Sequence, residues 1–469
     1  MPVDDLTSEP VRHPSSYVDP AGALFQEGEK LLRGIHPEFA PFYSDLLKKT
    51  FIQALLTSQL VETSIVPENL EGYALTLEHR KIEPLSFCFE WPAQMLKDAA
   101  LLTLDLSLQL VDHQLVLQDA YPWNVVFEGP RPRFVDFTSM IPEDPHLLWV
   151  AYDQFCRFFL FPLAVAHERS GKIMRALLLD YLDGISITDL RTCLSWSSFI
   201  RMGWLVRRVY LPQLLMNLMG GTKKGNAIVT LSQKLKPDVR MRRGFFESLR
   251  RDILSISPKI KKSFWSAYYS DIESFFQPAS FDLKQSTVAR LLSQLHPKTV
   301  VDIGCNQGGF SILAALAGAR VAAFDKDEDS IALLYELAKK RELNILPLVI
   351  DFLAPSPSCG WNAVQFPAAP RRLRAEMAMA LALTHHLAIT QRQTFERIVS
   401  ALADYSERWL LTEFVPLDDP RSKELMVTHQ RDMRWYTLEA FKETLGKIYP
   451  TVEVFPSHPE GRILILCSK

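Results

Sequence analysis

Hydrophobic and polar positions alternate in blocks along residues 263–469. Short apolar runs of strand length take turns with longer segments in which apolar residues recur at helical spacing. The predicted strands are TVVDIG (299–304), RVAAFD (320–325), ILPLVID (345–351), MAMALAL (377–383) and WLLTEFV (409–415). After a further predicted helix, TVEVFPS and RILILCS close the chain as an antiparallel pair. The alternation predicts an α/β domain built on a doubly wound, mostly parallel sheet with helices on both faces.

Residues 17–200 show a different pattern. The segments 22–35 and 73–82 predict short strands and turns. Residues 92–113 carry apolar residues at helical spacing behind a proline and predict a long helix. Three short apolar runs then predict strands separated by a loop and a turn: LVL (115–117), NVVF (124–127) and RFVDF (133–137). The pattern predicts an α+β domain in front of the α/β domain.

A basic stretch separates these two regions. The whole chain contains 52 Lys and Arg against 54 Asp and Glu, a net charge of −2 that excludes a protein basic throughout. Residues 201–262, however, contain 15 Lys and Arg against 3 Asp and Glu. Within them, residues 240–256 predict an amphipathic helix with a basic face. We interpret 201–262 as a basic helical connection that is either solvated or binds an anionic ligand. Nucleic acid is not expected, because aromatic residues do not interleave with the arginines.

The cysteines and the N-terminus indicate a compartment. The six cysteines form no CxxC pair and no Cys/His cluster with zinc-ligand spacing, so no metal site is predicted. Scattered thiols are typical of a reducing environment. Residues 1–16 are polar, predict a flexible N-terminus and contain no apolar signal-peptide core. The longest apolar run is too short to span a bilayer. We therefore expect a cytoplasmic protein without a transmembrane segment.

The strongest motif follows the first predicted strand of the α/β domain. The sequence VVDIGCNQGGFS places Asp302, Gly304 and Gly308 in an Asp-x-Gly-x-x-x-Gly pattern directly before a predicted helix. Glycines allow a tight turn and let a ligand approach the backbone closely. Cys305 and Asn306 lie inside this turn. A dinucleotide fingerprint would need a further glycine at the G-x-G-x-x-G spacing, which is absent.

The next two predicted strands each end in an acidic residue. The second ends in Asp325-Lys326, and an acid at this place can bind two ribose hydroxyls. The third ends in Asp351-Phe352, a polar and aromatic pair suited to the edge and face of an adenine. The glycine turn and both acids occur in chain order on three successive strands. Together they predict a nucleoside-binding edge of the sheet.

This arrangement resembles the class I S-adenosylmethionine (SAM)-dependent methyltransferases over roughly residues 280–469. The resemblance implies a Rossmann-like seven-stranded sheet with a reversed last strand, and SAM as the cofactor. It also implies that Gly304 to Gly308 line the methionine part of SAM, Asp325 the ribose and Asp351 the adenine. An α/β domain that has lost its ligand remains the alternative.

Candidate catalytic residues follow the fourth and fifth strands. His385 and His386 lie in LTHHL, where the resemblance places the methyl group and its acceptor. A neutral imidazole there can take a proton from a hydroxyl acceptor. The alternative is that one histidine packs against the next strand and the other caps a helix. Glu413, at the end of LLTEF, can orient a base, bind a substrate hydroxyl or serve as a structural acid.

The front region carries a second pattern. Asp119 and Asn124 stand in an Asp-x4-Asn arrangement, and Asp136-Phe137 follows twelve residues later. This resembles the catalytic and metal-binding loops of protein-kinase-like phosphotransferases. Gln118 stands where those proteins usually have a basic residue, and no G-x-G-x-x-G or Val-Ala-x-Lys lies upstream. The resemblance therefore implies a degenerate kinase-like domain that binds substrate or acts as a scaffold, with a chance pattern as the alternative.

The combination of motifs is more specific than either half. EWPAQMLKDAALLTLDL, QDAYPWNVVF, DIGCNQG and LALTHHL occur in this order. Together they resemble the NoeA-like family of bacterial two-part SAM-dependent methyltransferases, from about residue 17 to the end. The resemblance implies methyl transfer to a nucleophile, most simply a hydroxyl, of a small molecule or glycan. A bifunctional kinase-methyltransferase and a SAM-binding regulatory module without turnover remain the alternatives.

Overall fold

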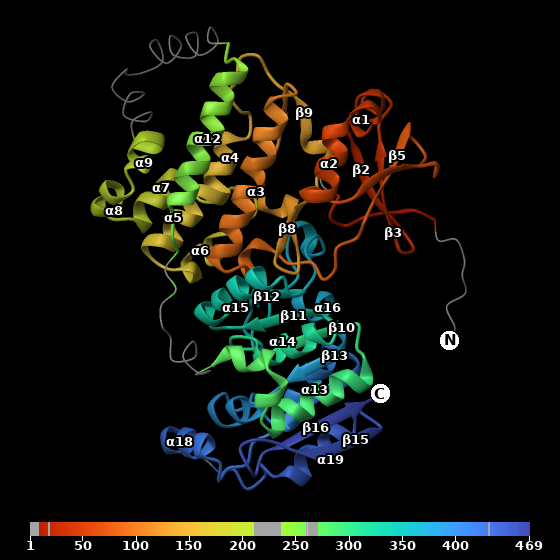
Figure 1. Ribbon diagram of the computed structural model, residues 1–469, viewed down its shortest axis with the longest axis vertical. Coiled ribbons are helices and arrows are strands. Elements are labelled where there is room, and N and C mark those ends of the chain that lie inside the picture. The colour runs from red at the N-terminus through yellow and green to blue at the C-terminus, as the bar shows by residue number, and fades with distance from the viewer. Residues whose placement is uncertain (1–8, 17–18, 211–235, 259, 261–270, 430–431) are drawn as a thin grey trace.

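The computed structural model describes residues 9–16, 19–210, 236–258, 260, 271–429 and 432–469. The chain folds into an N-terminal half and a C-terminal half, which occupy the upper and lower parts of Figure 1. Residues 211–235 of the predicted basic connection lie outside the described residues. No helix in the described part of the chain is long and apolar enough to cross a membrane.

The N-terminal half begins with an antiparallel sheet and two helices. The strand order in this sheet is β1-β2-β3-β5-β4. Segment 22–35 forms the predicted short strands and turn, paired as a hairpin, and 73–82 contributes one strand. The elements are β1 (Val11–Arg12), β2 (Gly22–Glu27), β3 (Lys30–Ile35), α1 (Ala40–Leu47), α2 (Thr50–Ser58), β4 (Thr63–Val66) and β5 (Leu75–His79).

The long helix α3 (Ala93–Val111) forms the centre of this half, as the apolar spacing of 92–113 predicts. Most of its leucines are buried, so that the helix is covered on several sides. Two short antiparallel pairs follow it, β6 with β9 and β7 with β8. The strands are β6 (Leu115–Leu117), β7 (Val125–Glu128), β8 (Arg131–Phe134) and β9 (Met140–Pro142).

Helices complete the N-terminal half. The apolar segment 155–166 is a buried helical stretch, in which a π-helical turn at Cys156–Leu160 joins two α-helical pieces. The described helices are α4 (Tyr152–Phe155), α5 (Phe161–Glu168), α6 (Gly171–Leu177), α7 (Ile187–Cys193), α8 (Trp196–Arg201), α9 (Gly203–Leu205) and α12 (Val239–Ser255).

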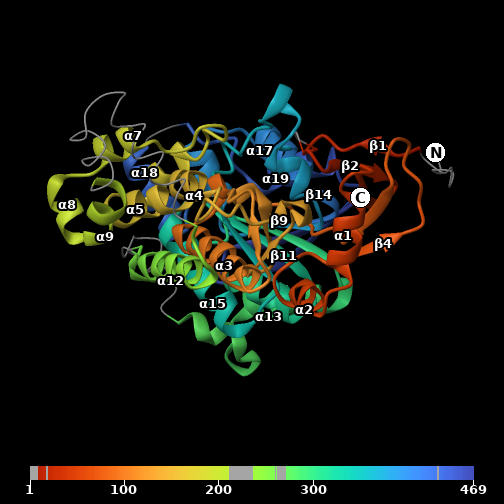
Figure 2. The same cartoon turned by 90° about the horizontal axis from the view of Figure 1, so that it is seen from above.

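Helix α12 confirms the predicted amphipathic segment. It packs along α3 (Figure 2). Phe246, Leu249 and Ile253 on its apolar face are buried. The arginines of the basic stretch are largely neutralised among the described residues. Six of them form ion pairs: Arg201 with Glu168, Arg207 and Arg208 with Asp252, Arg242 with Glu143, Arg243 with Asp112, and Arg250 with Asp105. The excess of basic residues in this stretch therefore does not by itself indicate an anion-binding surface.

The C-terminal half is the predicted seven-stranded α/β sheet, with strand order β12-β11-β10-β13-β14-β16-β15. The first five strands along the chain run parallel, and β16 lies antiparallel between β14 and β15. The strands are β10 (Thr299–Ile303), β11 (Arg320–Asp325), β12 (Ile345–Val349), β13 (Ala375–Ala380), β14 (Ser406–Phe414), β15 (Thr451–Pro456) and β16 (Ile463–Ser468).

The order of the strands places a ligand site. After β10 the chain moves outward to β11 and β12, and then returns to place β13 on the other side of β10. Ligands bind at such a switch point, beyond the carboxyl ends of the strands. The helices are α13 (Leu283–Leu295), α14 (Gly309–Leu316), α15 (Glu328–Arg341), α16 (Ala369–Arg372), α17 (Phe395–Asp404), α18 (Pro420–Thr428) and α19 (Leu438–Gly446).

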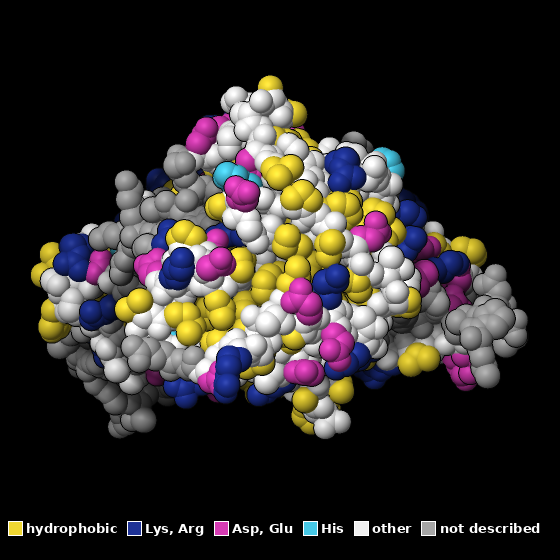
Figure 3. All heavy atoms as spheres, turned by 90° about the horizontal axis from the view of Figure 1, so that it is seen from below, with side chains coloured by type: hydrophobic (Ala, Val, Ile, Leu, Met, Phe, Trp, Pro, Cys, Tyr) yellow, Lys and Arg dark blue, Asp and Glu magenta, His cyan; other side chains and the backbone are white. Residues whose placement is uncertain are grey.

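The two halves share one hydrophobic core. Helix α15 packs on α3, where the Tyr335 hydroxyl donates to Asp98 Oδ2 at 2.6 Å. The guanidinium of Arg372 pairs with Glu90, and both side chains are buried. The face of the molecule seen from below shows hydrophobic side chains interrupted by charges of both signs (Figure 3). The contacts above tie the α/β sheet to the N-terminal half through packed side chains and buried charge.

Candidate cofactor and active site

The glycine motif forms the turn between β10 and α14. Gly304 and Gly308 have φ angles of 70° and 77°, in the left-handed region that glycine adopts without a steric penalty. The N–H groups of Gly304 and Cys305 both donate to the carbonyl of Phe324 on β11. A Cβ at Gly308 would lie 2.5 Å from the buried Leu334 side chain. The turn therefore offers a backbone cradle that only glycine fits.

Asp302 lies behind this turn. It is 3% exposed, and its carboxylate accepts a hydrogen bond of 2.6 Å from Ser311 Oγ on α14. Burial raises the pKa of Asp302 to about 6. Asp302 thus fastens the helix to the strand and shapes the cradle from behind, and the nearby Cys305 thiol is also buried.

Asp325 ends β11 beside the turn. Its two carboxylate oxygens accept the N–H groups of Asn306 and Asp327, each at 2.9 Å. A carboxylate offers about four acceptor positions, so two remain for hydroxyl donors. Burial raises the pKa of Asp325, whereas the neighbouring Lys326 is exposed. This fixed carboxylate fits the two hydroxyls of a ribose.

Asp351 and Phe352 lie beyond β12, at the same edge of the sheet. Both side chains are half-buried. Asp351 Oδ1 accepts the N–H of Leu353 at 3.0 Å, and the ring of Phe352 lies 6.2 Å from that of Tyr405. A partly open carboxylate next to a partly open ring suits a planar base that hydrogen-bonds at its edge.

The two histidines lie on the segment that follows β13. Their ring centroids are 4.1 Å apart. His385 is 2% exposed, and its Nδ1 has no hydrogen-bond partner among the described residues. Burial lowers the pKa of His385 to about 2 and that of His386 to about 4. Both imidazoles are therefore neutral at pH 7, and the half-buried His386 is the more accessible of the two.

Glu413 is fully buried and its carboxylate is occupied by protein groups. Oε2 accepts from Lys284 Nζ at 2.7 Å and from the N–H of Ala382 at 2.8 Å, and Oε1 accepts from Ser457 Oγ at 2.6 Å. These contacts favour the structural alternative. Glu413 is placed to position the segment that carries the histidines.

Sequence reasoning missed three of the groups around Glu413: Lys284, Ala382 and Ser457. Ala382 has a φ of 52°, so β13 ends at Ala380 and the apolar run 377–383 overestimates the strand. No local sequence pattern predicts these contacts, because the partners lie 129, 31 and 44 residues from Glu413 along the chain.

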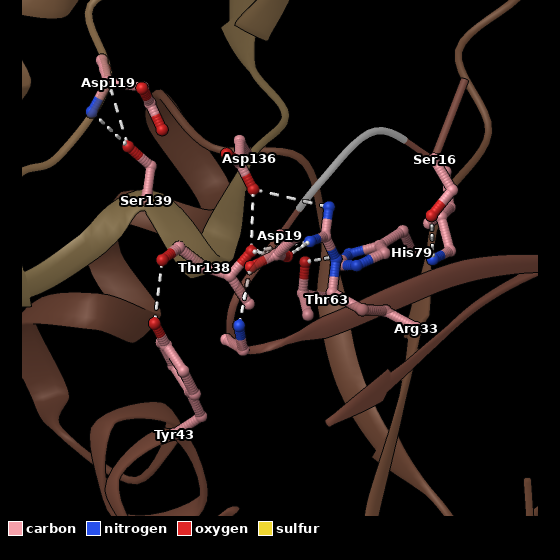
Figure 4. A network of polar contacts seen from close by, with 12 residues as sticks. Ser16, Asp19, Arg33, Tyr43, Thr63, His79, Asp119, Asp136, Thr138 and Ser139 are labelled. Carbon is pink, nitrogen blue, oxygen red and sulfur yellow. Dashed lines mark hydrogen bonds and ion pairs between the residues drawn. The ribbon is translucent and has the colours of Figure 1, made fainter. Parts of the chain in front are cut away.

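The kinase-like residues of the front half are also brought together. Asp119, Asn124 and Asp136 line one cavity. Figure 4 shows Arg33 reaching both Asp19 and Asp136, with 3.3 Å between Arg33 Nη2 and Asp136 Oδ1. The sequence did not single out Arg33 or Asp19. Among the described residues, no group of three or more His, Cys, Asp or Glu side chains could hold a metal ion.

Comparison with known proteins agrees with the methyltransferase-like α/β domain of the C-terminal half. The family model of tellurite resistance protein TehB matches residues 268–354, which contain the glycine turn, Asp325 and Asp351. A probable S-adenosyl-L-methionine-dependent methyltransferase TehB of Haemophilus influenzae is 40% identical over 60 residues, 13% of this chain and 21% of that protein. The C-terminal sheet and its helices form a SAM-dependent methyltransferase domain, with S-adenosylmethionine as the cofactor.

A second relative extends along nearly the whole chain. The nodulation protein NoeA of Rhizobium meliloti is 28% identical over 452 residues, 93% of this chain and 92% of that protein. A crystal structure of monomeric WbdD is 19% identical, with a TM-score of 0.29 over 46% of this chain and 47% of the other, so the match spans about half of that protein. The crystal structure of Haemophilus influenzae TehB is 18% identical, with a TM-score of 0.30 over 42% and 66%.

Proposed function

We propose that this protein transfers a methyl group from SAM to a nucleophile, most simply a hydroxyl, of a small molecule or glycan. The observation that carries the proposal is the clustering of the glycine cradle, Asp325 and the histidine pair beyond the carboxyl ends of neighbouring parallel strands. That edge is where an α/β sheet binds its ligands.

Methyl transfer from SAM mainly requires that the methyl donor and the acceptor are correctly positioned. Bound SAM supplies an activated methyl group on a sulfonium sulfur. The chain then has to hold donor and acceptor in line, and orientation of this kind can contribute ~7–11 kcal/mol. The cradle from Gly304 to Gly308 would hold the methionine end of the cofactor, and Asp325 would accept hydrogen bonds from the ribose hydroxyls. The ring of Phe352 would pack against the adenine, and Asp351 would accept a hydrogen bond from the amino group at its edge.

A proton has to leave a hydroxyl acceptor during transfer. His386 is neutral at pH 7 and half-buried, so its imidazole can accept that proton. His385 packs against it and supports its orientation.

Calorimetry with S-adenosylhomocysteine tests the cofactor site directly. The wild-type protein should bind it, and Asp325→Ala should weaken binding at least tenfold, since a charge-assisted hydrogen bond contributes about 1.5–3 kcal/mol. Asp404→Ala, which removes an exposed acid of the same domain, is the matched control. Equal binding by Asp325→Ala and the control would overturn the assignment.

Labelled SAM tests the transfer itself. Incubation of the protein with labelled SAM and fractionated cell extract should label a small-molecule or glycan fraction. His386→Gln should reduce that labelling at least tenfold while leaving S-adenosylhomocysteine binding intact. Binding of the cofactor without labelling of any fraction would support a regulatory module in place of an enzyme.

We further propose that residues 17–200 form a degenerate kinase-like domain, joined by residues 201–262 to the methyltransferase domain at 263–469. The lining of a single cavity by Asp119, Asn124 and Asp136 supports the likeness. The pairing of Asp136 with Arg33 argues against a metal there. Magnesium-dependent ATP hydrolysis that is lost in Asp136→Ala would instead establish the bifunctional alternative.

A further inference from the structure

Helix α6 of the N-terminal half contacts the C-terminal half beside the candidate ribose site. In Figure 1 it lies just above α15. An ion pair joins the two helices, with 2.8 Å between Arg175 Nη1 and Glu328 Oε1. Glu328 is the first residue of α15 and stands three positions after Asp325 along the chain. The N-terminal half therefore holds the segment that carries the ribose acid.

The ion pair is well enclosed. The side chain of Arg175 is 11% exposed and that of Glu328 is 24% exposed. The carboxylate of Glu328 also lies directly against Gly171, because a Cβ added at Gly171 would overlap Glu328 Oε1. A residue without a side chain at position 171 thus lets Glu328 reach Arg175. Partly buried charges of this kind are screened by solvent less than exposed ones.

Helix α6 is itself fixed in the N-terminal half. Met174 on this helix is fully buried, and Ser170 Oγ caps the helix by accepting the N–H of Ile173 at 3.3 Å. The helix packs against α5 and against the 3-10 turn Cys88–Glu90. An arginine on a rigid element can hold its partner in one place.

A short chain of hydrogen bonds connects Glu328 with Asp325. Asp327 Oδ1 accepts the N–H of Ser330 at 2.8 Å and caps α15. The N–H of Asp327 donates to Asp325 Oδ1 at 2.9 Å. The first turn of α15 therefore supplies one of the two backbone bonds that orient the Asp325 carboxylate. Holding Glu328 in place holds this turn and, through it, Asp325.

The N-terminal half also contacts the segment that follows Asp351. Ser15 Oγ donates to the carbonyl of Gln365 at 2.9 Å. The ring of Phe366 lies 5.1 Å from that of Phe87. Both acids of the candidate cofactor site are therefore followed by segments that the N-terminal half contacts.

We propose that Arg175 and Gly171 are positioning residues of the SAM site, so that the N-terminal half sets the affinity of the methyltransferase domain for its cofactor. The inference rests on the methyltransferase function proposed above. It gives the N-terminal half a role that does not depend on whether its kinase-like residues bind a ligand. Arg175 acts through Glu328 and the first turn of α15, which would present the Asp325 carboxylate to the ribose.

Calorimetry with S-adenosylhomocysteine tests the role of Arg175 in the full-length protein, at a temperature well below unfolding. Arg175→Gln should weaken binding about three- to fivefold, the effect of losing a partly exposed ion pair. Arg175→Lys should recover most of this loss, because it keeps the charge. Arg250→Gln is the control, since it removes an ion pair between α12 and α3 inside the N-terminal half.

A merely structural ion pair would give a different result. Arg175→Gln would then lower the melting temperature while the folded protein bound S-adenosylhomocysteine as tightly as the wild type, and that outcome would overturn the proposal. If the wild type itself does not bind S-adenosylhomocysteine, the cofactor assignment fails together with the proposal. Normal binding by the wild type and by Arg175→Gln removes the positioning role alone.

Gly171→Ala tests the same contact from the other side. The added Cβ displaces the end of the flexible Glu328 side chain, so the variant should fold and should lose affinity by a similar factor. Gly203→Ala is the matched control, because Gly203 also begins a short helix but an added Cβ there meets open space among the described residues. Equal affinities of Gly171→Ala and this control would contradict the proposal.

A double-mutant cycle tests whether Arg175 and Glu328 act through each other. The double variant Arg175→Gln with Glu328→Gln should bind S-adenosylhomocysteine no more weakly than the weaker of the two single variants, because each substitution removes the same contact. Losses that add in the double variant would show that the two residues act separately, and would overturn the proposed path from Arg175 to Asp325.

Discussion

A single strained residue shapes the segment between β13 and the histidines. Ala382 has a left-handed backbone, which costs a non-glycine residue roughly 1–2 kcal/mol. Its N–H is held by the buried carboxylate of Glu413. The bend brings Leu383 against the cofactor turn, where a Cβ added to Gly304 would lie 3.2 Å from Leu383 Cδ1. The same bend therefore couples the histidine segment to the cradle.

Gly308→Ala should weaken both folding and cofactor binding. The added Cβ meets Leu334 in a left-handed backbone, so we expect a loss of about 2–4 kcal/mol in the free energy of unfolding. Urea unfolding and S-adenosylhomocysteine calorimetry measure the two effects. Gly318→Ala is a matched control, because Gly318 also has a positive φ but open space around it. Similar losses of cofactor affinity in both variants would contradict the role of the cradle.

The half-buried His386 predicts a pH-dependent stability. Its folded pKa, about 4, lies below its ordinary value of 6.5, so the unfolded chain binds the proton more readily. The stabilisation is present above pH 6.5 and is lost as the pH falls towards 4. Between pH 7 and pH 5 the wild type should lose up to about 2 kcal/mol more than His386→Gln. Urea unfolding at both pH values checks this, and parallel losses would contradict it. Comparing the two proteins cancels the opposite contribution of Asp302, whose pKa is raised.

Among the secondary-structure elements, α13 and β14 are joined by buried charge. Lys284 at the start of α13 pairs with Glu413 near the end of β14, and its ammonium also lies 4.9 Å from the centre of the Phe310 ring on α14. Three elements that frame the cofactor site thus converge on one ammonium group. The Lys284–Glu413 ion pair therefore joins α13 to the sheet, and the contact of Lys284 with Phe310 joins both to α14.

Glu413→Gln should destabilise the protein by about 3–5 kcal/mol, because it leaves a buried ammonium without a counter-charge. The double variant Glu413→Gln with Lys284→Met should recover most of that loss, since no charge is then left unpaired. Chemical unfolding of the wild type, the two single variants and the double variant measures the coupling. A double variant as unstable as Glu413→Gln would mean that the Ala382 and Ser457 contacts dominate.

Across the protein as one body, the two halves depend on each other. Arg372, at the end of α16, reaches Glu90 and the carbonyl of Leu85, and lies 4.7 Å from the centre of the Phe87 ring. All three partners belong to the N-terminal half. Because these contacts and the shared core cross the boundary, we expect both halves to unfold together.

Arg372→Met should lower the free energy of unfolding by about 3–5 kcal/mol, because Glu90 is 0% exposed and would keep its charge without a partner. Calorimetric melting of the variant should show a lower transition temperature, and Arg372→Lys should show a smaller shift. An unchanged melting temperature would contradict the inferred dependence of one half on the other.

The secondary structure of this chain could be predicted from the sequence where it depends on the local spacing of apolar residues. The strand and helix alternation of 299–349, the long helix at 92–113 and the apolar face of α12 all follow from periods of two or 3.6 residues. The places of the glycine turn, Asp325 and Asp351 could also be predicted, because each directly follows a predicted strand. The end of β13 was not, since its bend depends on Glu413.

The linear order of residues therefore determined the parallel sheet, the glycine turn after β10 and the places of Asp325 and Asp351 beside their strands. Only the tertiary structure decided that Glu413 accepts hydrogen bonds from three distant groups and that Arg33 pairs with Asp136. It also decided that most arginines of the basic stretch are paired and that a cavity lies between the halves. The physical reason is the separation along the chain over which each interaction acts. Backbone periodicity and turns act over a few residues, whereas buried ion pairs and cavities arise where segments far apart in the chain meet in a medium that penalises every unpaired charge.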